Sequence, residues 1–298
     1  MAGRVLLTGG SGQLGQSILK LASPSAQCSW VAPTRYELDL SDENSVRRLL
    51  EGESWSAVVN CAAYTAVDAA ESDAVAARAV NSNGPKYLAE ACEVAGIPIL
   101  HVSTDYVFDG RKSAPYVESD VANPLSVYGR TKLDGEELLA KAATRHLILR
   151  TAWVHSPYGS NFVRTMMRLA RDRQSVRVVA DQVGSPTYAP HLAEAIVQIT
   201  RRVISNPQNV AWGIYNAAGT GETSWAGFAK EVFRHAKCHD LPVANVVRIT
   251  SNDYPTAAPR PANSRLDCSA LKSAFGLQLP SWKQGVKECI SSIARSSL

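Results

Sequence analysis

The sequence has 298 residues, of which 45% are hydrophobic and 19% charged, and its formal net charge is +4. This composition is typical of a soluble globular protein with one large domain or two modest ones. Basic residues are scattered and no apolar run reaches the length of a membrane span. These features exclude the usual signatures of nucleic-acid-binding and membrane proteins.

The six cysteines form no C-x-x-C pair and no cluster with histidines at metal-ligand spacing. A glycine turn interrupts the N-terminal apolar stretch by Gly9, which argues against a signal peptide. We therefore expect a cytoplasmic protein with reduced thiols and no metal site.

The first half of the sequence alternates between strand-like and helix-like segments. Short apolar runs predict strands at Val5–Thr8, Ser29–Pro33, Ala57–Asn60, Pro98–Ser103 and Leu147–Thr151. Helical patterns lie between them at Gly12–Leu21, Glu43–Leu50, Ala74–Ala95 and Leu125–Ala143. This alternation predicts an α/β fold with a Rossmann-type, doubly wound parallel sheet, in which ligands bind at the carboxyl ends of the strands.

The second half is less regular. It predicts a helix at Phe162–Arg171, a strand at Val176–Val179 and a helix at His191–Ile204, followed by a looser region with a proline-rich loop at Tyr254–Pro261. We expect an NAD(P)-binding domain at residues 1–152, completed by segments around 175–210. Residues 153–298 would form mainly a smaller substrate-binding domain, interleaved with the first.

A glycine-rich turn, TGGSGQLG, joins the first predicted strand to the first predicted helix. Its glycines at 9, 10, 12 and 15 match G-x-G-x-x-G and G-x-x-G-x-x-G. Glycines at this spacing let a pyrophosphate approach the backbone at a helix N-terminus, where free N–H groups and the helix dipole favour anions. The alternative is a glycine-rich turn with no ligand, but the strand–turn–helix context favours a dinucleotide site.

Tyr128 and Lys132 lie four residues apart in SVYGRTKLDGEE. On a helix they share one face, and a nearby ammonium would lower the pKa of the phenol and make it a general acid or base near neutrality. Thr104, directly after the fourth predicted strand, would complete a Thr–Tyr–Lys triad. Taken separately, Tyr128 and Lys132 could be a pair on the surface of a helix, and Thr104 could cap a loop. Together they favour hydride transfer to or from a carbonyl.

Cofactor preference depends on the end of the second predicted strand. An acidic residue there would bind the ribose 2′-hydroxyl of NAD, but this sequence has Thr34 and Arg35. A guanidinium pairs with a 2′-phosphate, so we predict NADPH, with NADH as a second cofactor that the site could accept. The histidines at 101, 155 and 191 have no metal-like partners by spacing and are predicted to be core or surface residues.

Seven stretches carry a family resemblance over nearly the whole length: TGGSGQLG, NCAAYTAVDAAESD, STDYVFDG, YGRTKLDGE, RTAWVHSPYGSNF, DQVGSPTYA and RPANSRLD. The sequence closely resembles the dTDP-4-dehydrorhamnose reductases, which are extended short-chain dehydrogenases/reductases. The resemblance implies reduction of the 4-keto group of a dTDP-linked 6-deoxy sugar with NADPH or NADH. In that reaction Tyr128 would donate a proton, Lys132 would hold the nicotinamide ribose and Thr104 would polarise the carbonyl.

The resemblance also implies the binding residues. The expected cofactor site consists of Gly9, Ser11, Gly12, Gln13, Leu14, Arg35, Asp39, Leu40, Ala62, Ala63, Tyr64, Thr65, Ser103, Tyr128 and Lys132. The expected substrate contacts are Thr104, Asp105, Tyr128, Trp153, Asn161, Arg260 and Asn263.

Some relatives dimerise around magnesium held by glutamates, and the sequence departs from them at Gln16. A monomer or a homodimer therefore stays open. Two alternative functions are also open. One is a different sugar-nucleotide reductase or an epimerase, which would share the front half. The other is a non-catalytic NADP-binding subunit similar to the regulatory beta subunit of methionine adenosyltransferase.

Overall fold

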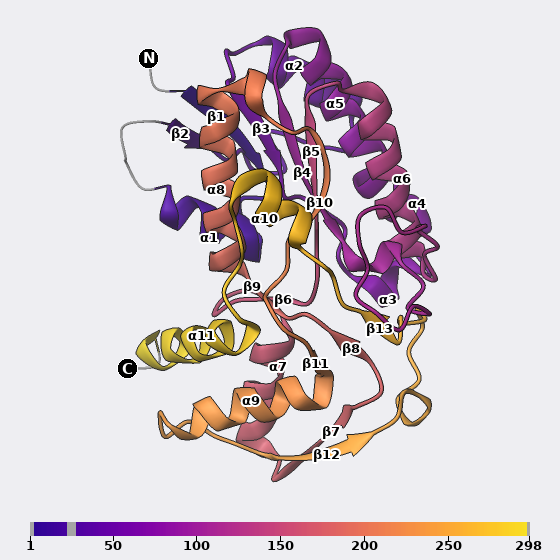
Figure 1. Cartoon of the computed structure of the whole chain (residues 1–298), viewed down its shortest axis with the longest axis vertical. Coiled ribbons are helices and arrows are strands. Elements are labelled where there is room, and N and C mark those ends of the chain that lie inside the picture. Colours follow the sequence, from indigo (N-terminus) through magenta and orange to yellow (C-terminus); the bar gives the residue numbers. More distant parts are fainter. Residues whose placement is uncertain (1–2, 23–27, 297–298) are drawn as a thin grey trace.

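A six-stranded parallel sheet forms the centre of the larger lobe in the computed structural model, which describes residues 3–22 and 28–296 (Figure 1). The strands are β1 (Gly3–Thr8), β2 (Cys28–Val31), β3 (Ala57–Asn60), β4 (Ile99–Thr104), β5 (His146–Thr151) and β10 (Gly213–Asn216). They lie in the order β10-β5-β4-β3-β1-β2, so the chain reverses direction across the sheet between β1 and β3. In sheets of this kind such a reversal opens a ligand crevice at the carboxyl ends of the strands.

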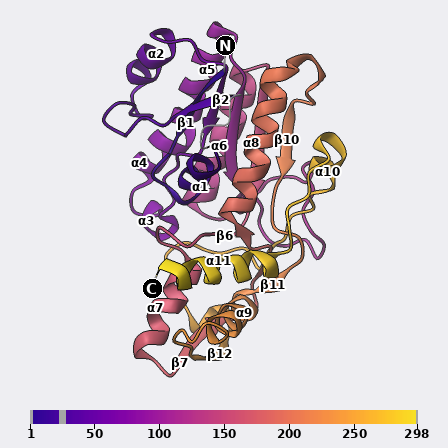
Figure 2. The same ribbon diagram turned by 90° about the vertical axis from the view of Figure 1, so that its left-hand side faces the viewer.

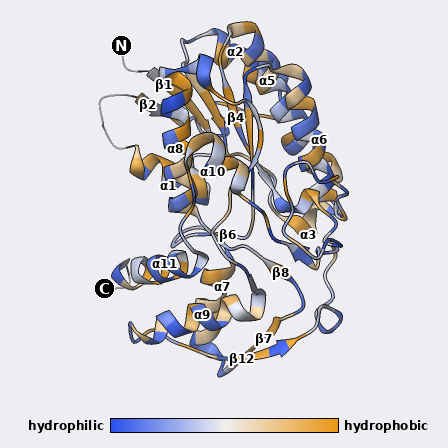
Figure 3. Cartoon of the chain, viewed as in Figure 1, coloured by the Kyte–Doolittle hydropathy of each residue, from blue (hydrophilic) through white to orange (hydrophobic). Residues whose placement is uncertain are grey.

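Helices cover both faces of the sheet. On one face are α1 (Gln13–Leu21) and α8 (Ala189–Ser205), and on the other are α2 (Glu43–Glu51), α5 (Gly84–Ala95) and α6 (Val127–Ala142). Successive side chains of a strand alternate between the faces. Leu7 therefore packs with Ile18 of α1 in one core, whereas Leu6 packs with Leu88 of α5 in the other. The apolar strands of this sheet are largely orange in Figure 3.

All five strands predicted for the first half are confirmed, with ends that differ by at most two residues. The long helix predicted at Ala74–Ala95 is interrupted. It consists of α4 (Ala74–Arg78), a π-helical turn η1 (Ala79–Asn83) and α5. Pro85 has no N–H to donate to the Asn81 carbonyl, which is a reason for the wider turn. The turn brings the Asn81 side chain to the backbone of Tyr64, which lines the cleft described below.

The second half contributes to both lobes. Strand β10, which the sequence pattern did not reveal, extends the large sheet by pairing with β5. Within the segment around 175–210, α8 packs on α1, but β7 (Ser175–Val179) pairs with β12 (Asn245–Ile249) in the smaller lobe.

The smaller lobe also holds α7 (Phe162–Asp172) and two helices that the sequence analysis left unassigned, α9 (Trp225–Lys237) and α11 (Trp282–Ser296). Figures 1 and 2 both place α7, α9, β7 and β12 at the end of the molecule opposite α2.

Several short elements complete the fold. The strands are β6 (Val154–His155), β8 (Val183–Gly184), β9 (Thr187–Tyr188), β11 (Thr223–Ser224) and β13 (Asn263–Ser264). The helices are α3 (Val67–Ala70) and α10 (Ser269–Phe275), with 3₁₀ turns at Asp105–Val107, Pro207–Asn209 and Ser251–Asp253. No helix within residues 3–22 and 28–296 is long and apolar enough to span a bilayer.

Candidate active site

A cleft of about 2010 Å³ opens at the carboxyl ends of the sheet strands and extends into the smaller lobe. Its walls come from the glycine turn, the segments after β2, β3 and β4, helices α6 and α7, strand β7 and the loop around 251–260. Every predicted site residue except Asn263 lines this cleft. Residues that are far apart in the sequence are thus brought to one cavity.

The glycine turn approaches other backbone segments closely. Gly9 has a φ of +70°, and a Cβ on Gly15 would lie 2.2 Å from the Gly9 carbonyl oxygen, so side chains cannot be accommodated there. In contrast, a Cβ on Gly12 would meet only the Gly9 oxygen, at 3.3 Å. Gly12 precedes α1 and receives no side-chain cap, so the first N–H groups of the helix are left for a ligand. This open position suits a pyrophosphate.

At the other end of the expected cofactor site, Arg35 is exposed and lines the cleft beside Asp39 and Leu40. Two nearby carboxylates bind local partners instead. Glu37 Oε2 accepts a hydrogen bond from the Thr34 N–H at 2.7 Å, and Asp39 Oδ1 accepts from Ser41 at 2.6 Å. A guanidinium is therefore available where the 2′-phosphate of NADPH is expected.

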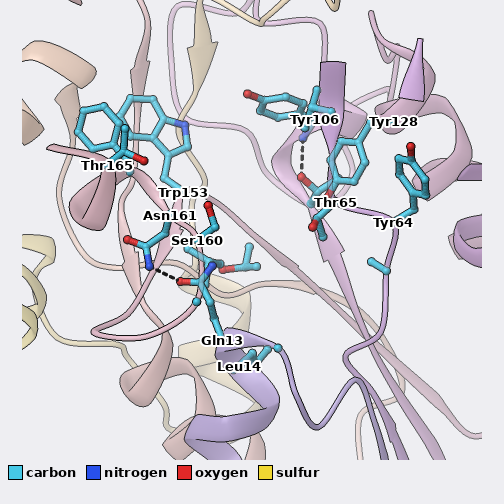
Figure 4. Close-up of a pocket in the computed structure, with 18 of the residues that line it drawn as sticks. Gln13, Leu14, Tyr64, Thr65, Tyr106, Tyr128, Trp153, Ser160, Asn161 and Thr165 are labelled. Atoms are coloured by element: carbon cyan, nitrogen blue, oxygen red, sulfur yellow. Dashed lines mark hydrogen bonds between the residues drawn. The ribbon is translucent and has the colours of Figure 1, made fainter. Parts of the chain in front are cut away.

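Tyr128 lies in the first turn of α6, as predicted. The helix begins at a Ser126 cap, and Glu71 accepts a hydrogen bond from the Val127 N–H at 2.7 Å. Gly129 allows the helix to approach the turn after β4, because a Cβ there would lie 2.3 Å from the Tyr106 carbonyl oxygen. The rings of Tyr106 and Tyr128 meet edge-on at 5.8 Å, on the side of the pocket opposite Trp153 (Figure 4).

The sequence predicted that Lys132 would lower the pKa of Tyr128, but the pKa of the phenol is raised. Burial raises the pKa of Tyr128 to about 12, a hydrogen bond with Thr104 partly opposes this, and the charge of Asp105 raises it further. The lysine ammonium hydrogen-bonds other groups, the Val102 carbonyl at 2.8 Å and His101 Nε2 at 3.1 Å. Tyr128 therefore keeps its proton at neutral pH and is suited to act as an acid.

Lys132 is almost completely buried, and burial lowers its pKa to about 8, although Glu136 and Cys61 oppose the shift. Its partner His101 is fully buried and also contacts Asn60, at 3.0 Å. By its spacing in the sequence, His101 is predicted to be an ordinary core or surface residue. In the sequence, only its position in the predicted fourth strand, just before Thr104 and Asp105, could have indicated a role in the site.

Thr104 is the last residue of β4 and Asp105 begins the 3₁₀ turn that follows, and both line the cleft. Thr104 Oγ1 accepts a hydrogen bond from the Tyr106 N–H at 3.2 Å and donates to Asp105 Oδ1 at 3.0 Å. Burial raises the pKa of Asp105 to about 7, and hydrogen bonds from Ser264 and Thr104 only partly offset that effect. Within the described residues, the buried Asp105 Oδ2 and Ser103 Oγ have no hydrogen-bond partner. Buried polar atoms usually have partners, so these two atoms suit a bound ligand.

Trp153 forms the opposite wall. It has a φ of +47°, which is unfavourable for a bulky residue, and its ring stacks on Trp225 with centroids 3.5 Å apart. Its Nε1 donates to Ser264 Oγ at 3.1 Å, and a Cβ on Gly184 would lie 2.4 Å from its ring. Trp225 also lines the cleft, although no sequence motif identified it.

Three further residues among the expected substrate contacts, Asn161, Arg260 and Asn263, also bind protein partners. Asn161 Nδ2 donates to Gln13 Oε1 at 2.9 Å (Figure 4), and its Oδ1 caps α7. Arg260 forms a two-point ion pair with Asp68, at 2.8 and 2.7 Å.

Asn263 is buried outside the cleft and donates to the carbonyls of Lys112 and Ala114. Its amide fastens two loops together, and its contact with the substrate stays a prediction.

Gln16, where some relatives have a glutamate, donates to the Ser11 carbonyl at 2.7 Å. In the part of the chain that the structure describes, no group of three or more His, Cys, Asp and Glu side chains is placed to hold a metal ion.

Comparison with known proteins gives a consistent result. The chain is 43% identical over 295 residues to the dTDP-4-dehydrorhamnose reductase of Sinorhizobium fredii, covering 96% of both. A solved dTDP-4-dehydrorhamnose reductase of Bacillus anthracis, in complex with NADP, is 32% identical and superposes with a TM-score of 0.91, over 98% of this chain and 100% of that one.

A solved relative from Clostridium acetobutylicum is 35% identical, with a TM-score of 0.90 over 97% of this chain and 99% of that one. Residues 3–295 match the family described as the RmlD substrate binding domain. The match spans nearly the whole chain, and the protein belongs to the RmlD family.

Proposed function

We propose that this protein is an NADPH-dependent dTDP-4-dehydrorhamnose reductase. It reduces the 4-keto group of dTDP-4-dehydro-6-deoxy-L-mannose to give dTDP-L-rhamnose, the last step of dTDP-rhamnose biosynthesis. The observation that carries this proposal is the meeting of the glycine turn, Thr104, Tyr128 and Lys132 in one cleft of a chain that matches reductases over its full length.

NADPH, when bound in this cleft, would supply the hydride. Thr104 hydrogen-bonds the 4-keto oxygen, and Tyr128 delivers its phenolic proton to the oxygen as negative charge develops there. The raised pKa of Tyr128, about 12, keeps that proton in place until it is needed. Lys132 holds the nicotinamide ribose, and Trp153 with Asp105 orients the sugar.

The residues present fit the cofactor. The open space at Gly12 and the N–H groups of α1 suit the pyrophosphate, and Arg35 suits the 2′-phosphate. The segment at 62–65 and Ser103, whose hydroxyl has no partner within the described residues, line the cleft between the glycine turn and Tyr128.

Arg260 could have a further role in binding the substrate. Breaking the Arg260–Asp68 pair would free a guanidinium to bind the diphosphate of the sugar nucleotide. We propose a monomer or a homodimer, with neither nucleic acid nor membrane as a partner.

The direct test is to incubate the protein with NADPH and freshly generated dTDP-4-dehydrorhamnose and to identify the product by NMR. Stoichiometric NADPH oxidation with formation of dTDP-L-rhamnose is expected. An epimerase would change stereochemistry without net oxidation of NADPH, and a non-catalytic subunit would bind NADPH without turnover. Either result would contradict the proposal.

Replacing Arg35 by alanine should remove most of the preference for NADPH. Hydrogen bonds to charged groups contribute on the order of 1.5–3 kcal/mol, which corresponds to a preference of about tenfold to a hundredfold. The ratio of kcat/KM for NADPH and NADH, measured for parent and variant, checks this. Arg47→Ala removes the same charge from an exposed site on α2 outside the cleft and is the matched control. Equal ratios in the parent and Arg35→Ala would show that Arg35 has no part in cofactor choice.

Catalysis is expected to need no metal, because Tyr128 supplies the acid. Activity should therefore survive dialysis against EDTA. Loss of turnover with the chelator, followed by recovery with Mg²⁺ or another divalent ion, would contradict this prediction.

A further inference from the structure

A chain of buried polar side chains connects the end of β1 to Lys132. Thr8 Oγ1 donates to Asn60 Oδ1 at 2.6 Å, Asn60 Nδ2 lies 3.0 Å from His101 Nδ1, and His101 Nε2 lies 3.1 Å from Lys132 Nζ. None of these four side chains is more than 3% exposed. This row of contacts therefore connects β1, which leads into the glycine turn, with Lys132, the lysine next to the proposed acid Tyr128.

The orientation of the Asn60 amide follows from its neighbours. The Ala62 N–H can only donate, and it lies 3.2 Å from Asn60 Oδ1. The Ala62 N–H also lies 3.3 Å from Thr8 Oγ1, but an NH₂ group in place of Asn60 Oδ1 would set two donors against each other. The amide oxygen therefore faces Ala62 and Thr8, and the NH₂ group faces His101. An NH₂ group requires an acceptor, so this contact favours an unprotonated Nδ1 on the imidazole.

The Lys132 contact makes a competing demand. An ammonium can only donate, so it requires an unprotonated Nε2. A neutral imidazole has one acceptor nitrogen and cannot satisfy both Asn60 and a charged Lys132. A neutral lysine amine removes the conflict, because it accepts from Nε2–H while Nδ1 accepts from Asn60. In both states the lysine can still donate to the Val102 carbonyl, 2.8 Å from Nζ.

We propose that His101 is a positioning residue for Lys132, and that its tautomer follows the charge of the lysine. With Lys132 as an ammonium, the imidazole carries its proton on Nδ1. When the array loses a proton, Nζ passes one proton to Nε2 and the Nδ1 proton leaves to solvent, so that Lys132 becomes an amine and His101 stays neutral. The consequence for cofactor binding rests on the proposed function, in which charged Lys132 holds the nicotinamide ribose.

Of the groups that contact Lys132 or shift its pKa, none titrates in the same range as the lysine; Asp105, whose pKa burial raises to about 7, is not among them. Burial lowers the pKa of His101 well below its usual value and lowers that of Lys132 to about 8. Burial raises the pKa of both Cys61 and Tyr128 to about 12, so the thiol and the phenol stay neutral over the range in which Lys132 loses its proton.

The other charged groups near Lys132 form a pair of their own. Glu136, one turn further along α6, is bound to Arg150 of β5 at 2.6 Å. The charge on Lys132 should therefore be lost as the pH rises through about 8.

The test uses the unmodified protein with ¹⁵N-labelled histidine, without cofactor. Imidazole ¹⁵N resonances report which ring nitrogen carries the proton. His101 is expected to carry it on Nδ1 below the Lys132 pKa of about 8 and on Nε2 above it. His155, which is also fully buried but lies in the smaller lobe, is the internal control and should keep one tautomer. A His101 tautomer that stays the same on both sides of this pH would overturn the proposal.

A variant tests the consequence for cofactor binding. In His101→Gln, one amide oxygen can accept from both Asn60 and Lys132, so the conflict disappears and the ammonium is favoured. Binding of NADPH to the parent should weaken as the pH rises above 8, and in His101→Gln this weakening should move upward by about one pH unit. The control His155→Gln makes the same substitution in the smaller lobe and should leave the pH profile unchanged.

Superimposable pH profiles for the parent and a folded His101→Gln variant would overturn the proposal. The NMR measurement needs no variant and decides the tautomer change by itself. A tautomer change without any NADPH binding by the parent would support the positioning role and contradict the proposed function.

Discussion

Replacement of Tyr128 by phenylalanine is expected to lower kcat by a factor of about 10² to 10⁴ while leaving NADPH affinity almost unchanged, because general acid catalysis typically contributes that much. The ring of phenylalanine keeps the edge-on contact with Tyr106, so the loss is confined to the hydroxyl. Raising or lowering the pH should not restore activity, since the proton donor itself is missing. Single-turnover reduction at saturating NADPH and substrate measures the effect on the chemical step.

Tyr215→Phe is the matched control for this experiment. Tyr215 lies on β10, outside the cleft, and its hydroxyl donates to the Ala211 carbonyl at 2.8 Å. Removal of this hydroxyl should therefore cost little activity. Activity of Tyr128→Phe within a few-fold of the parent at every accessible pH would contradict the assignment of Tyr128 as the general acid. Loss of NADPH affinity in the same variant would instead indicate a structural role.

The second large effect concerns stability. Glu136 on α6 and Arg150 on β5 form a two-point ion pair in which the side chains are only 2% and 4% exposed. Glu136→Ala leaves the guanidinium buried without its carboxylate, and breaking a buried pair in this way costs about 3–5 kcal/mol. Urea unfolding should show a correspondingly lower midpoint with an unchanged slope.

The control lies on the same helix. Asp134 pairs with Arg78 at 2.8 Å, but these side chains are 37% and 61% exposed. Asp134→Ala should therefore cost at most about 1 kcal/mol. A loss of similar size for Glu136→Ala would show that water or another group compensates Arg150. The same substitution removes a charge that favours the Lys132 ammonium, so any remaining activity should decline at a lower pH than in the parent.

The sequence by itself determined those features that depend on neighbours within one element. The parallel strands follow from apolar runs such as Val5–Thr8 and Leu147–Thr151. The dinucleotide turn follows from glycines spaced over a few residues, and the shared face of Tyr128 and Lys132 follows from helical periodicity. Local spacing suffices for these features because a strand or a helix sets the geometry between residues that are close in sequence.

The tertiary structure decided everything that depends on long-range packing. The four-residue strand β10 forms because it pairs with β5. This pairing leaves no signal in the local sequence of β10. Arg260 faces Asp68 and Asn263 faces Lys112, across 192 and 151 residues, so residue type alone could not tell a substrate ligand from a structural contact.

The pKa of Tyr128 shows the same limit at the centre of the site. Helical spacing placed Lys132 one turn away, but it could not reveal that the lysine binds His101 and Val102. Burial then raises the phenol pKa to about 12, against the direction that spacing predicted. A pKa depends on desolvation and on which atoms meet, and both are set only when distant segments pack around the same cavity.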